Sequence, residues 1–386
     1  MYPTPFALER FFARHEFSAR YLLSTSDCEG LAMADLLARA EPDLRERWER
    51  LHLGYTESQG LPELRAEIAT LYERTDAAEI LVAAPEEAVF LAMNALLEPG
   101  DQVICTFPGY QSLYQLALSI GCGVTLWKPT EPEGWRFDPG WLEQNLRPDT
   151  KLVVWNFPHN PTGALPAAED FGRMVAAAAG VGAWVFSDEM YRLLEPSGDM
   201  RLPAAVDRYE RAISLSGMSK VFGLAGLRIG WVASHDAHLL QRINTLKDYT
   251  TICSSAPSEL LALMALRSRD EVVATHRDRV GRNIQAARGF FDRHASRFSW
   301  IPPRAGTVCF PRLVPEAPGV GEPAAGRGGA EQFCEHVLRD TGVLLLPSTV
   351  YGYGDDHFRV GLGREDFVAG LGALDVYLES LEGQTR

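Results

Sequence analysis

The chain has 386 residues, which is long for one compact core and short for three, so we expect two packed domains. Its composition, 46% hydrophobic and 23% charged, is that of a globular protein, and its formal net charge of −14 disfavours nucleic acid and anionic membranes as partners. The sequence has no signal-peptide-like apolar region and no CxxC among its six cysteines, so we expect a cytoplasmic protein with reduced thiols and no metal site.

From about residue 80 to 235, short apolar runs alternate with helix-length patterns. The runs lack polar alternation, which is typical of strands buried on both faces of a mostly parallel sheet. The expected strands are Asp101–Thr106, Gly123–Trp127, Lys151–Asn156, Ala183–Ser187, Ala212–Ser216 and Ile229–Ala233. The segments between them predict helices over Glu87–Leu97, Tyr110–Ile120 and Ala167–Ala179.

Helices dominate the next part of the chain, which ends in a long amphipathic helix over Arg269–His294. The C-terminal part mixes strands and helices: strands at Thr307–Leu313, Val343–Leu346 and His357–Val360, and helices at Ala330–Asp340 and Arg364–Leu381. Pro315–Gly329 is rich in proline and glycine, which predicts a surface loop. We therefore expect a large domain at 45–275 and a small α+β domain made of 1–44 and 276–386.

The first indication of a catalytic residue comes from the segment LSGMSKVFGLAGLRIG at residues 215–230. Lys220 follows an apolar strand and is flanked by small residues, which leave the amine accessible, while apolar surroundings would lower its pKa. Both properties favour attack of the amine on a carbonyl group. Because a lone lysine is more often a surface side chain, its role depends on the neighbouring motifs.

Three ordered motifs give the sequence a family resemblance. Residues 217–230 resemble the pyridoxal-phosphate attachment site of class I/II aminotransferases, residues 156–163 (NFPHNPTG) resemble that family's NPxNPTG loop, and residues 187–191 (SDEMY) resemble its strand-end D-E-x-Y motif. Order and spacing also agree, and the resemblance covers nearly the whole chain. It implies the α/β fold of fold type I pyridoxal-phosphate-dependent transferases, in which helices sandwich a mostly parallel sheet beside a smaller α+β domain.

The resemblance implies roles around the ring of pyridoxal 5′-phosphate. Lys220 would hold the cofactor's aldehyde covalently and then act as the base that moves a proton. Asp188 would keep the pyridine nitrogen protonated, so that the ring accepts electrons. Asn160 and Tyr191 would hydrogen-bond the ring's phenolic oxygen, and Tyr110 would stack on its face. Lys220, Asp188 and Tyr191 are thus the expected catalytic residues.

The resemblance also implies a phosphate site with cations and donors at a helix N-terminus. Arg228 and Ser219 would contribute side chains. Tyr55, in the segment GYTESQG at 54–60, would reach the phosphate of a neighbouring subunit, which implies a homodimer with shared active sites. Ala84, Glu86 and Glu87 would contribute backbone groups.

Two departures from the family pattern affect the phosphate site. Residues 84–88 read APEEA where the family commonly has GSQEA, so Pro85 has no N–H to donate and Glu86 brings a negative charge near a dianion. Proline is nevertheless well tolerated in the first turn of a helix. The second departure is Gly217, where the family often has a phosphate-binding serine.

For the substrate, Arg359 in the segment HFRVG at 357–361 matches the family arginine that binds the α-carboxylate. A guanidinium group can form two parallel hydrogen bonds with a carboxylate, which a lysine cannot do. Asn160 would also contact the substrate. Asp27 and Glu29 lie where family members place backbone that faces the substrate, and either would suit a cationic side chain, although loop acids are more often solvated.

Two enzymatic functions remain open. The leading hypothesis is an aminotransferase that moves an amino group between an amino acid and a 2-oxo acid. The alternative is a fold type I lyase or cyclase, because the segments at 157–163, 247–251 and 254–259 also resemble capreomycidine-synthase-like enzymes, which cyclise a hydroxylated arginine. A ligand-sensing transcription regulator is disfavoured by the net charge and by the lack of a DNA-binding module.

Overall fold

The computed structural model of the protein describes residues 3–314 and 329–384. The loop expected at 315–329 lies, apart from Gly329, outside the described residues. In the part of the chain that is described, no helix is both long and apolar enough to span a bilayer.

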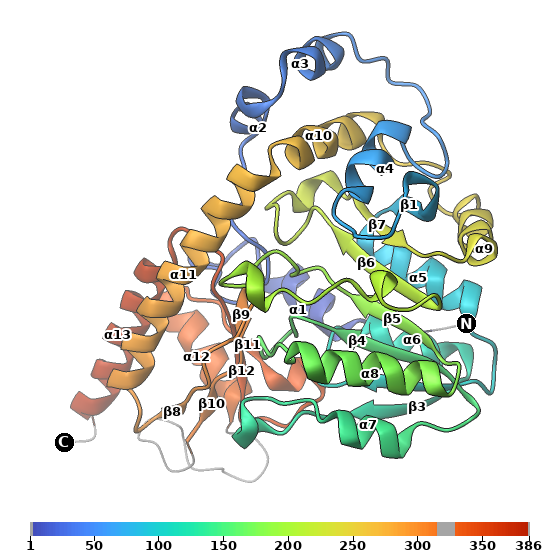
Figure 1. The fold of residues 1–386 in the computed structure, drawn as a ribbon. Coiled ribbons are helices and arrows are strands. Elements are labelled where there is room, and N and C mark those ends of the chain that lie inside the picture. The colour runs from blue at the N-terminus through green and yellow to red at the C-terminus, as the bar shows by residue number, and fades with distance from the viewer. Residues whose placement is uncertain (1–2, 315–328, 385–386) are drawn as a thin grey trace.

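A seven-stranded sheet forms the centre of the larger part of the molecule, with the strand order β1-β7-β6-β5-β4-β2-β3 (Figure 1). The strands are β1 (Ile80–Ala83), β2 (Gln102–Thr106), β3 (Gly123–Trp127), β4 (Thr150–Asn156), β5 (Trp184–Asp188), β6 (Ala212–Gly217) and β7 (Gly230–Ala233). Strand β7 runs antiparallel to β1 and β6, and the other neighbouring strands are parallel. The six expected strands and the mostly parallel sheet are confirmed, and β1 is an additional strand that we did not expect.

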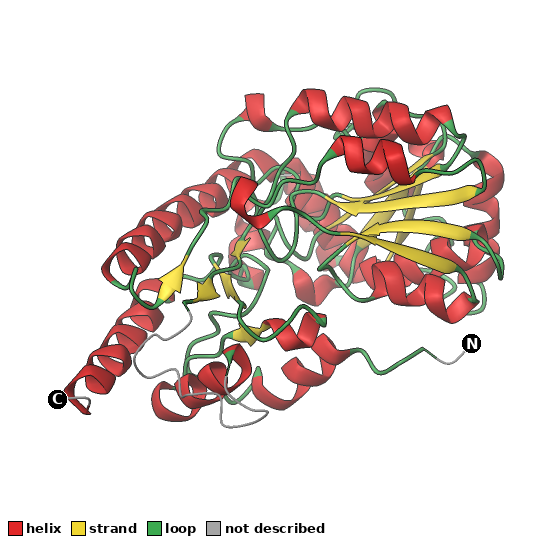
Figure 2. Cartoon of the chain, turned by 90° about the horizontal axis from the view of Figure 1, so that it is seen from below, coloured by secondary structure: helices red, strands yellow, loops and turns green. Residues whose placement is uncertain are grey.

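Helices cover both faces of this sheet, as Figure 2 shows. On one face, α5 (Pro85–Leu96), α6 (Ser112–Ile120) and α9 (Ala237–Lys247) share an apolar core with the strands. On the other face, α7 (Pro139–Asn145) and α8 (Ala168–Gly180) do the same. The expected sandwich of helices around the sheet is therefore confirmed.

The C-terminal part carries two small sheets. Strands β8 (Phe298–Ser299) and β10 (Arg312–Leu313) form one, and β9 (Val308–Cys309), β11 (Leu346–Pro347) and β12 (Phe358–Gly361) form the other, in the order β11-β12-β9. The helices around them are α11 (Arg269–Arg293), α12 (Ala330–Thr341) and α13 (Phe367–Gln384). The remaining helices are α1 (Ala7–His15), α2 (Met33–Arg39), α3 (Pro42–Glu49), α4 (Pro62–Ala69) and α10 (Ala256–Arg267).

Three expected elements in this part need correction. The single strand expected at 307–313 is two strands in different sheets, because the backbone at Pro311, which has no N–H to donate, separates them. The strand expected at 343–346 contributes only Leu346 to β11, while Val343 forms an isolated bridge with Tyr21. The helix expected from residue 364 begins at Phe367.

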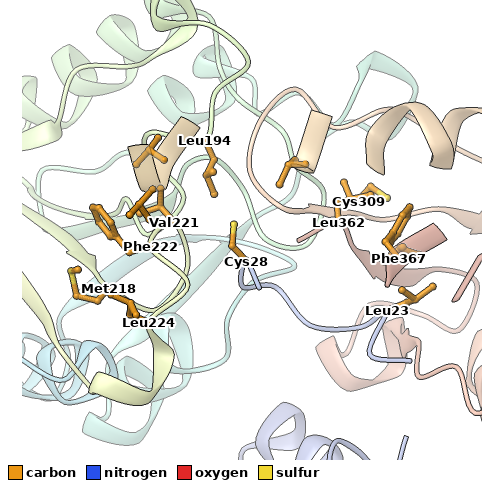
Figure 3. Close-up of a cluster of buried hydrophobic side chains, with 14 of the residues drawn as sticks. Leu23, Cys28, Leu194, Met218, Val221, Phe222, Leu224, Cys309, Leu362 and Phe367 are labelled. Carbon is orange, nitrogen blue, oxygen red and sulfur yellow. The ribbon is translucent and has the colours of Figure 1, made fainter. Parts of the chain in front are cut away.

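The N-terminal arm (residues 3–44) contacts the C-terminal sheets. The amides of Gly361 and Leu344 donate to the carbonyl oxygens of Leu23 and Tyr21, respectively. In Figure 3, Cys28 lies between Val221 on the large sheet's side and Leu362 on the C-terminal side. This contact between distant segments brings the N-terminal arm next to Lys220, although the division into domains at residues 45 and 276 stays a prediction.

Candidate active site

A cavity of about 360 Å³ opens at the carboxyl edge of the parallel strands. Asn156, at the end of β4, pairs with Asp188, at the end of β5, so the loops that follow these strands start level with each other. In open α/β sheets this edge is where ligands bind. The cavity brings together nine of the residues predicted from sequence: Glu86, Tyr110, Asn160, Asp188, Tyr191, Ser219, Lys220, Arg228 and Arg359.

Lys220 enters the cavity from the loop after β6. Val221 and Phe222, which follow it, are buried in the core and hold the loop in place (Figure 3). The lysine Nζ donates to Ser26 Oγ over 3.0 Å. Burial lowers the pKa of Lys220, Asp27 opposes that shift, and the positive charge of Arg359 adds to it. A lowered pKa increases the fraction of neutral amine, which is the form that attacks a carbonyl or takes up a proton.

Asp188 occupies the last position of β5 and is buried, with 7% of its surface exposed. Its Oδ1 accepts a hydrogen bond from the amide of Met190. Burial raises the pKa of Asp188 to about 7, because the charged form is poorly solvated there. A protonated ring nitrogen close to this carboxylate would restore its charge, so the environment of Asp188 suits a cationic partner.

Arg359, on β12, is 1% exposed and has no carboxylate within ion-pair distance among the described residues. Its Nε and Nη2 donate to the carbonyl oxygen of Ser24, and its Nη1 donates to Asn160 Oδ1 at 3.0 Å and Tyr351 Oη at 2.7 Å. A buried guanidinium group without an acidic partner is costly unless a ligand supplies the anion. The site is therefore suited to a carboxylate.

Tyr191 and Tyr110 line the same cavity but differ in their surroundings. Tyr191 is buried, and burial raises its pKa well above the ordinary value. Tyr110 follows β2, packs its ring against Phe6 at 5.0 Å between centroids, and donates from its hydroxyl group to Glu9 Oε1 at 3.1 Å. Both tyrosines therefore present hydroxyl groups that stay protonated at neutral pH.

Ser219 and Arg228 also line the cavity. The hydroxyl group of Ser219 is buried and has no hydrogen-bond partner among the described residues. Arg228 is exposed, and its backbone adopts the left-handed conformation at φ 54°, which is uncommon for residues other than glycine. An unsatisfied hydroxyl donor beside an arginine fits an anionic group such as a phosphate.

The structure does not bring three predicted residues into this cavity. The side chain of Tyr55 is 91% exposed. Glu87 Oε1 accepts hydrogen bonds from the hydroxyl groups of Thr250 and Thr251, away from the cavity. Ala84 is the N-cap residue of α5 and does not line the cavity either.

Several cavity residues escaped the sequence analysis. They are Glu9, Phe12, Glu16 and Ser26, all from the N-terminal arm. Tyr351, from the C-terminal part, was also missed: it does not line the cavity, but its hydroxyl group accepts a hydrogen bond from Arg359. The arm reaches the cavity because Gly361 allows close contact: a Cβ at this position would lie 1.7 Å from the carbonyl oxygen of Thr25. No local pattern identifies these residues. The two glycines that follow Arg359, Gly361 and Gly363, are nevertheless a sequence signal for close backbone packing.

These residues fit pyridoxal 5′-phosphate. The unpartnered hydroxyl of Ser219 suits the phosphate, and the buried carboxyl group of Asp188 suits the ring nitrogen. Lys220 lies in the same cavity and has the lowered pKa that attack on the aldehyde requires.

Comparisons with known proteins agree with this geometry. The family model described as aminotransferase class I and II matches residues 22–367. The chain is 29% identical to capreomycidine synthase from Streptomyces vinaceus over 95% of this chain and 92% of that protein, and 27% identical to an aspartate/prephenate aminotransferase from Cereibacter sphaeroides over 81% and 80%. The crystal structure of a PLP-dependent aminotransferase from Streptococcus suis superposes with a TM-score of 0.89 at 29% identity, covering 99% of each chain.

Proposed function

The chain belongs to the class I and II aminotransferases, and on that basis we propose how its own residues carry out amino transfer. It is a pyridoxal-phosphate-dependent enzyme that moves an amino group between an amino acid and a 2-oxo acid. The bound cofactor supplies an aldehyde that takes up the amino group and a ring that withdraws electrons from the substrate's α-carbon.

Lys220 is the proposed attachment point and proton carrier. Its lowered pKa favours a neutral amine, which would hold the cofactor's aldehyde and would take up the proton of the substrate's α-carbon. Asp188 holds the proton on the ring nitrogen, since its buried carboxyl group gains a cationic partner there. Asn160 and Tyr191 would hydrogen-bond the ring's phenolic oxygen, and Tyr110 would pack against the ring's face.

Arg359 is the proposed carboxylate receptor of the substrate. Asn160 and Tyr351 accept hydrogen bonds from its Nη1, and the carbonyl oxygen of Ser24 fixes its other nitrogens. A guanidinium group that is held in one orientation loses little entropy when it binds a carboxylate. With the carboxylate at Arg359 and the amino group at Lys220, the side chain of the substrate points toward the remaining wall of the cavity.

The observation that carries this proposal is the meeting of Lys220, Asp188 and Arg359, from three distant segments, in one cavity. The test is to purify the holoenzyme, add single amino acids, and record loss of the cofactor's absorbance together with the product. An amino acid that bleaches the cofactor and yields its 2-oxo acid, with the amino group recovered in an added acceptor, supports the proposal. Release of ammonia in place of amino transfer would contradict it.

A second candidate function is cyclisation of an amino acid with a cationic side chain, the activity implied by the likeness to capreomycidine synthase. Three acidic residues, Glu9, Glu16 and Asp27, line the cavity and would suit a cationic side chain. Arg364 pairs with Asp27 at 3.1 Å, so part of this negative charge is already neutralised. If a hydroxylated arginine gave a cyclic product that keeps its α-amino group, this second function would replace amino transfer.

A homodimer is also proposed, with Tyr55 of one subunit at the cofactor phosphate of the other. The exposed apolar side chains Leu53, Tyr55, Tyr249 and Ile252 lie on two segments that are joined by the Thr56 hydroxyl donating to the Ser254 carbonyl. Exposed large apolar side chains on neighbouring segments are typical of a subunit interface. The six cysteines, which are all free, are consistent with the proposed cytoplasmic location.

A further inference from the structure

The two departures from the family pattern lie against each other in the structure. A Cβ on Gly217 would lie 3.2 Å from Pro85 Cγ and 2.9 Å from Gly230 Cα. A Cβ on Gly230 would lie 2.8 Å from the same Pro85 carbon. The backbone of Gly230 and Ile229, together with the proline ring, therefore leaves little room for a serine at position 217.

This arrangement removes hydrogen-bond donors from the phosphate end of the cavity. Pro85 has neither the hydroxyl group nor the N–H of the serine that the family commonly has there, and Gly217 has no hydroxyl group. The donors that remain for the phosphate are Ser219 Oγ, the Arg228 guanidinium, the amides of the first turn of α5 and, in the proposed dimer, the hydroxyl group of the partner subunit's Tyr55. A phosphate dianion with three acceptor oxygens needs more donors than this when it is shielded from water.

Glu86 stands at the position where a further donor would fit. Its side chain follows Pro85 directly, lines the cavity beside Arg228, and is half-buried. Its Oε2 accepts a hydrogen bond from Ser112 Oγ at 3.1 Å. Glu87, the next residue, points instead to Thr250 and Thr251.

The charges around Glu86 favour its neutral form. Glu9 on α1 and Asp188 on β5 face it with negative charge, Arg228 faces it with positive charge, and Ser112 on α6 donates to it. Burial is the main cause that raises its pKa, to about 8, and the two acidic residues add to that effect. A bound phosphate would bring a further negative charge and would raise the pKa again.

We propose that the Glu86 side chain, as a neutral carboxylic acid, donates a hydrogen bond to the phosphate of the cofactor and replaces the donors lost at positions 85 and 217. This inference rests on the cofactor site proposed above. Cofactor affinity then depends on pH in a defined direction. Below the pKa of Glu86 the acid donates to the phosphate, and above it the carboxylate repels the phosphate, so affinity falls as the pH rises.

The test is the dissociation constant of pyridoxamine 5′-phosphate, which cannot attach to Lys220, measured from pH 6.5 to 9.5 by calorimetry with the full-length apoprotein. Glu86→Gln keeps a neutral donor of the same size at every pH. We expect equal affinities for both proteins at pH 6.5. Above pH 8 the wild type should bind more weakly than Glu86→Gln, and the ratio of their dissociation constants should rise by up to about tenfold for each pH unit. Glu87→Gln is the matched control and should follow the wild type.

Two further measurements separate this role from a merely structural one. Pyridoxamine without its phosphate should show no difference in pH dependence between wild type and Glu86→Gln. The infrared difference spectrum between the wild type and Glu86→Gln, both with bound pyridoxamine 5′-phosphate, should contain the carbonyl stretch of a protonated carboxylic acid.

The proposal is overturned if Glu86→Gln binds more tightly than the wild type by the same factor at every pH, because Glu86 would then be ionised throughout. It is also overturned if the two affinities agree at every pH, because the side chain would then not act on the phosphate. If the wild type bound no vitamin B6 phosphate at any pH, the cofactor site itself would be wrong.

Discussion

The cavity residues form two sets: the chain satisfies the first by itself, which we call the closed end (Lys220, Asp188 and Arg359), and leaves the second incomplete, which we call the open end (Ser219 and Arg228). At the end that contains Asp188 and Arg359, both charged groups are buried and held by hydrogen bonds from within the chain. At the end that contains Ser219 and Arg228, one donor lacks a partner and the guanidinium group is exposed. In the proposed mechanism the closed end binds ring and substrate, and the open end is completed by a group from a second subunit, for which Tyr55, with 91% of its side chain exposed, is the candidate.

The largest expected effect is at the closed end. Lys220→Ala removes the amine that attaches the cofactor and carries the proton, so we expect non-covalent cofactor binding and loss of multiple turnover. Borohydride reduction followed by peptide mapping checks the assignment, and the exposed Lys128, changed to alanine, is the control that should behave as wild type. Cofactor fixed on another lysine would contradict our assignment.

Asp188→Asn should have the next largest effect. A neutral amide cannot hold a proton on the ring nitrogen, so we expect turnover to fall by several decades. Without cofactor, the variant should nevertheless fold at least as stably as the wild-type apoprotein at neutral pH. Burial raises the pKa of Asp188 to about 7, so the charged form opposes folding above the ordinary carboxyl pKa, and the amide removes that cost. Single-turnover rates and thermal unfolding measure the two effects, and wild-type-like turnover would exclude the proposed role.

The closed end could be predicted from the sequence because its residues lie in contiguous motifs at the ends of buried strands. Uninterrupted apolar runs such as Leu152–Trp155 identify buried parallel strands, and the edge where these strands end places Asp188. Strand β1 was missed because its four residues are followed directly by Ala84 and Pro85, which form no turn pattern.

The rest of the site depends on contacts between distant segments. Ser26 meets Lys220 across 194 residues, and Tyr351 meets Asn160 across 191. Neither contact produces a pattern among neighbouring residues in the sequence, so the sequence alone does not predict it. The short strands β9, β10 and β11 have the same origin, since two-residue strands are set by their partners rather than by their own propensity.

Substitution of Arg359 tests substrate binding separately from cofactor binding. A charged hydrogen bond contributes about 1.5–3 kcal/mol, so Arg359→Ala should lower kcat/KM for amino acids by about tenfold to a hundredfold, with an unchanged cofactor spectrum. Arg359→Lys should recover only part of the loss. Amines without an α-carboxylate should be barely affected, and an equal loss with such amines would show that Arg359 is structural.

The smallest expected effect is at the open end. Tyr55→Phe removes one hydroxyl group that we expect to donate to the phosphate in the partner subunit. A single hydrogen bond contributes about 0.5–1.5 kcal/mol, so cofactor affinity should fall by about twofold to tenfold, while kcat at saturating cofactor should stay near the wild-type value. Equilibrium titration of the apoprotein measures the affinity.

Hybrid dimers decide whether Tyr55 acts within its own subunit or across the interface. When a Lys220→Ala subunit pairs with a Tyr55→Ala subunit, a shared site puts the intact Lys220 of one chain beside the intact Tyr55 of the other. Half of the sites in the hybrid would then be native, and activity at low cofactor concentration should rise above that of either parent. If Tyr55 served its own subunit, every site in the hybrid would carry one change, and mixing would restore nothing. Light scattering that finds a fully active monomer would likewise show that the open end is completed by the chain itself.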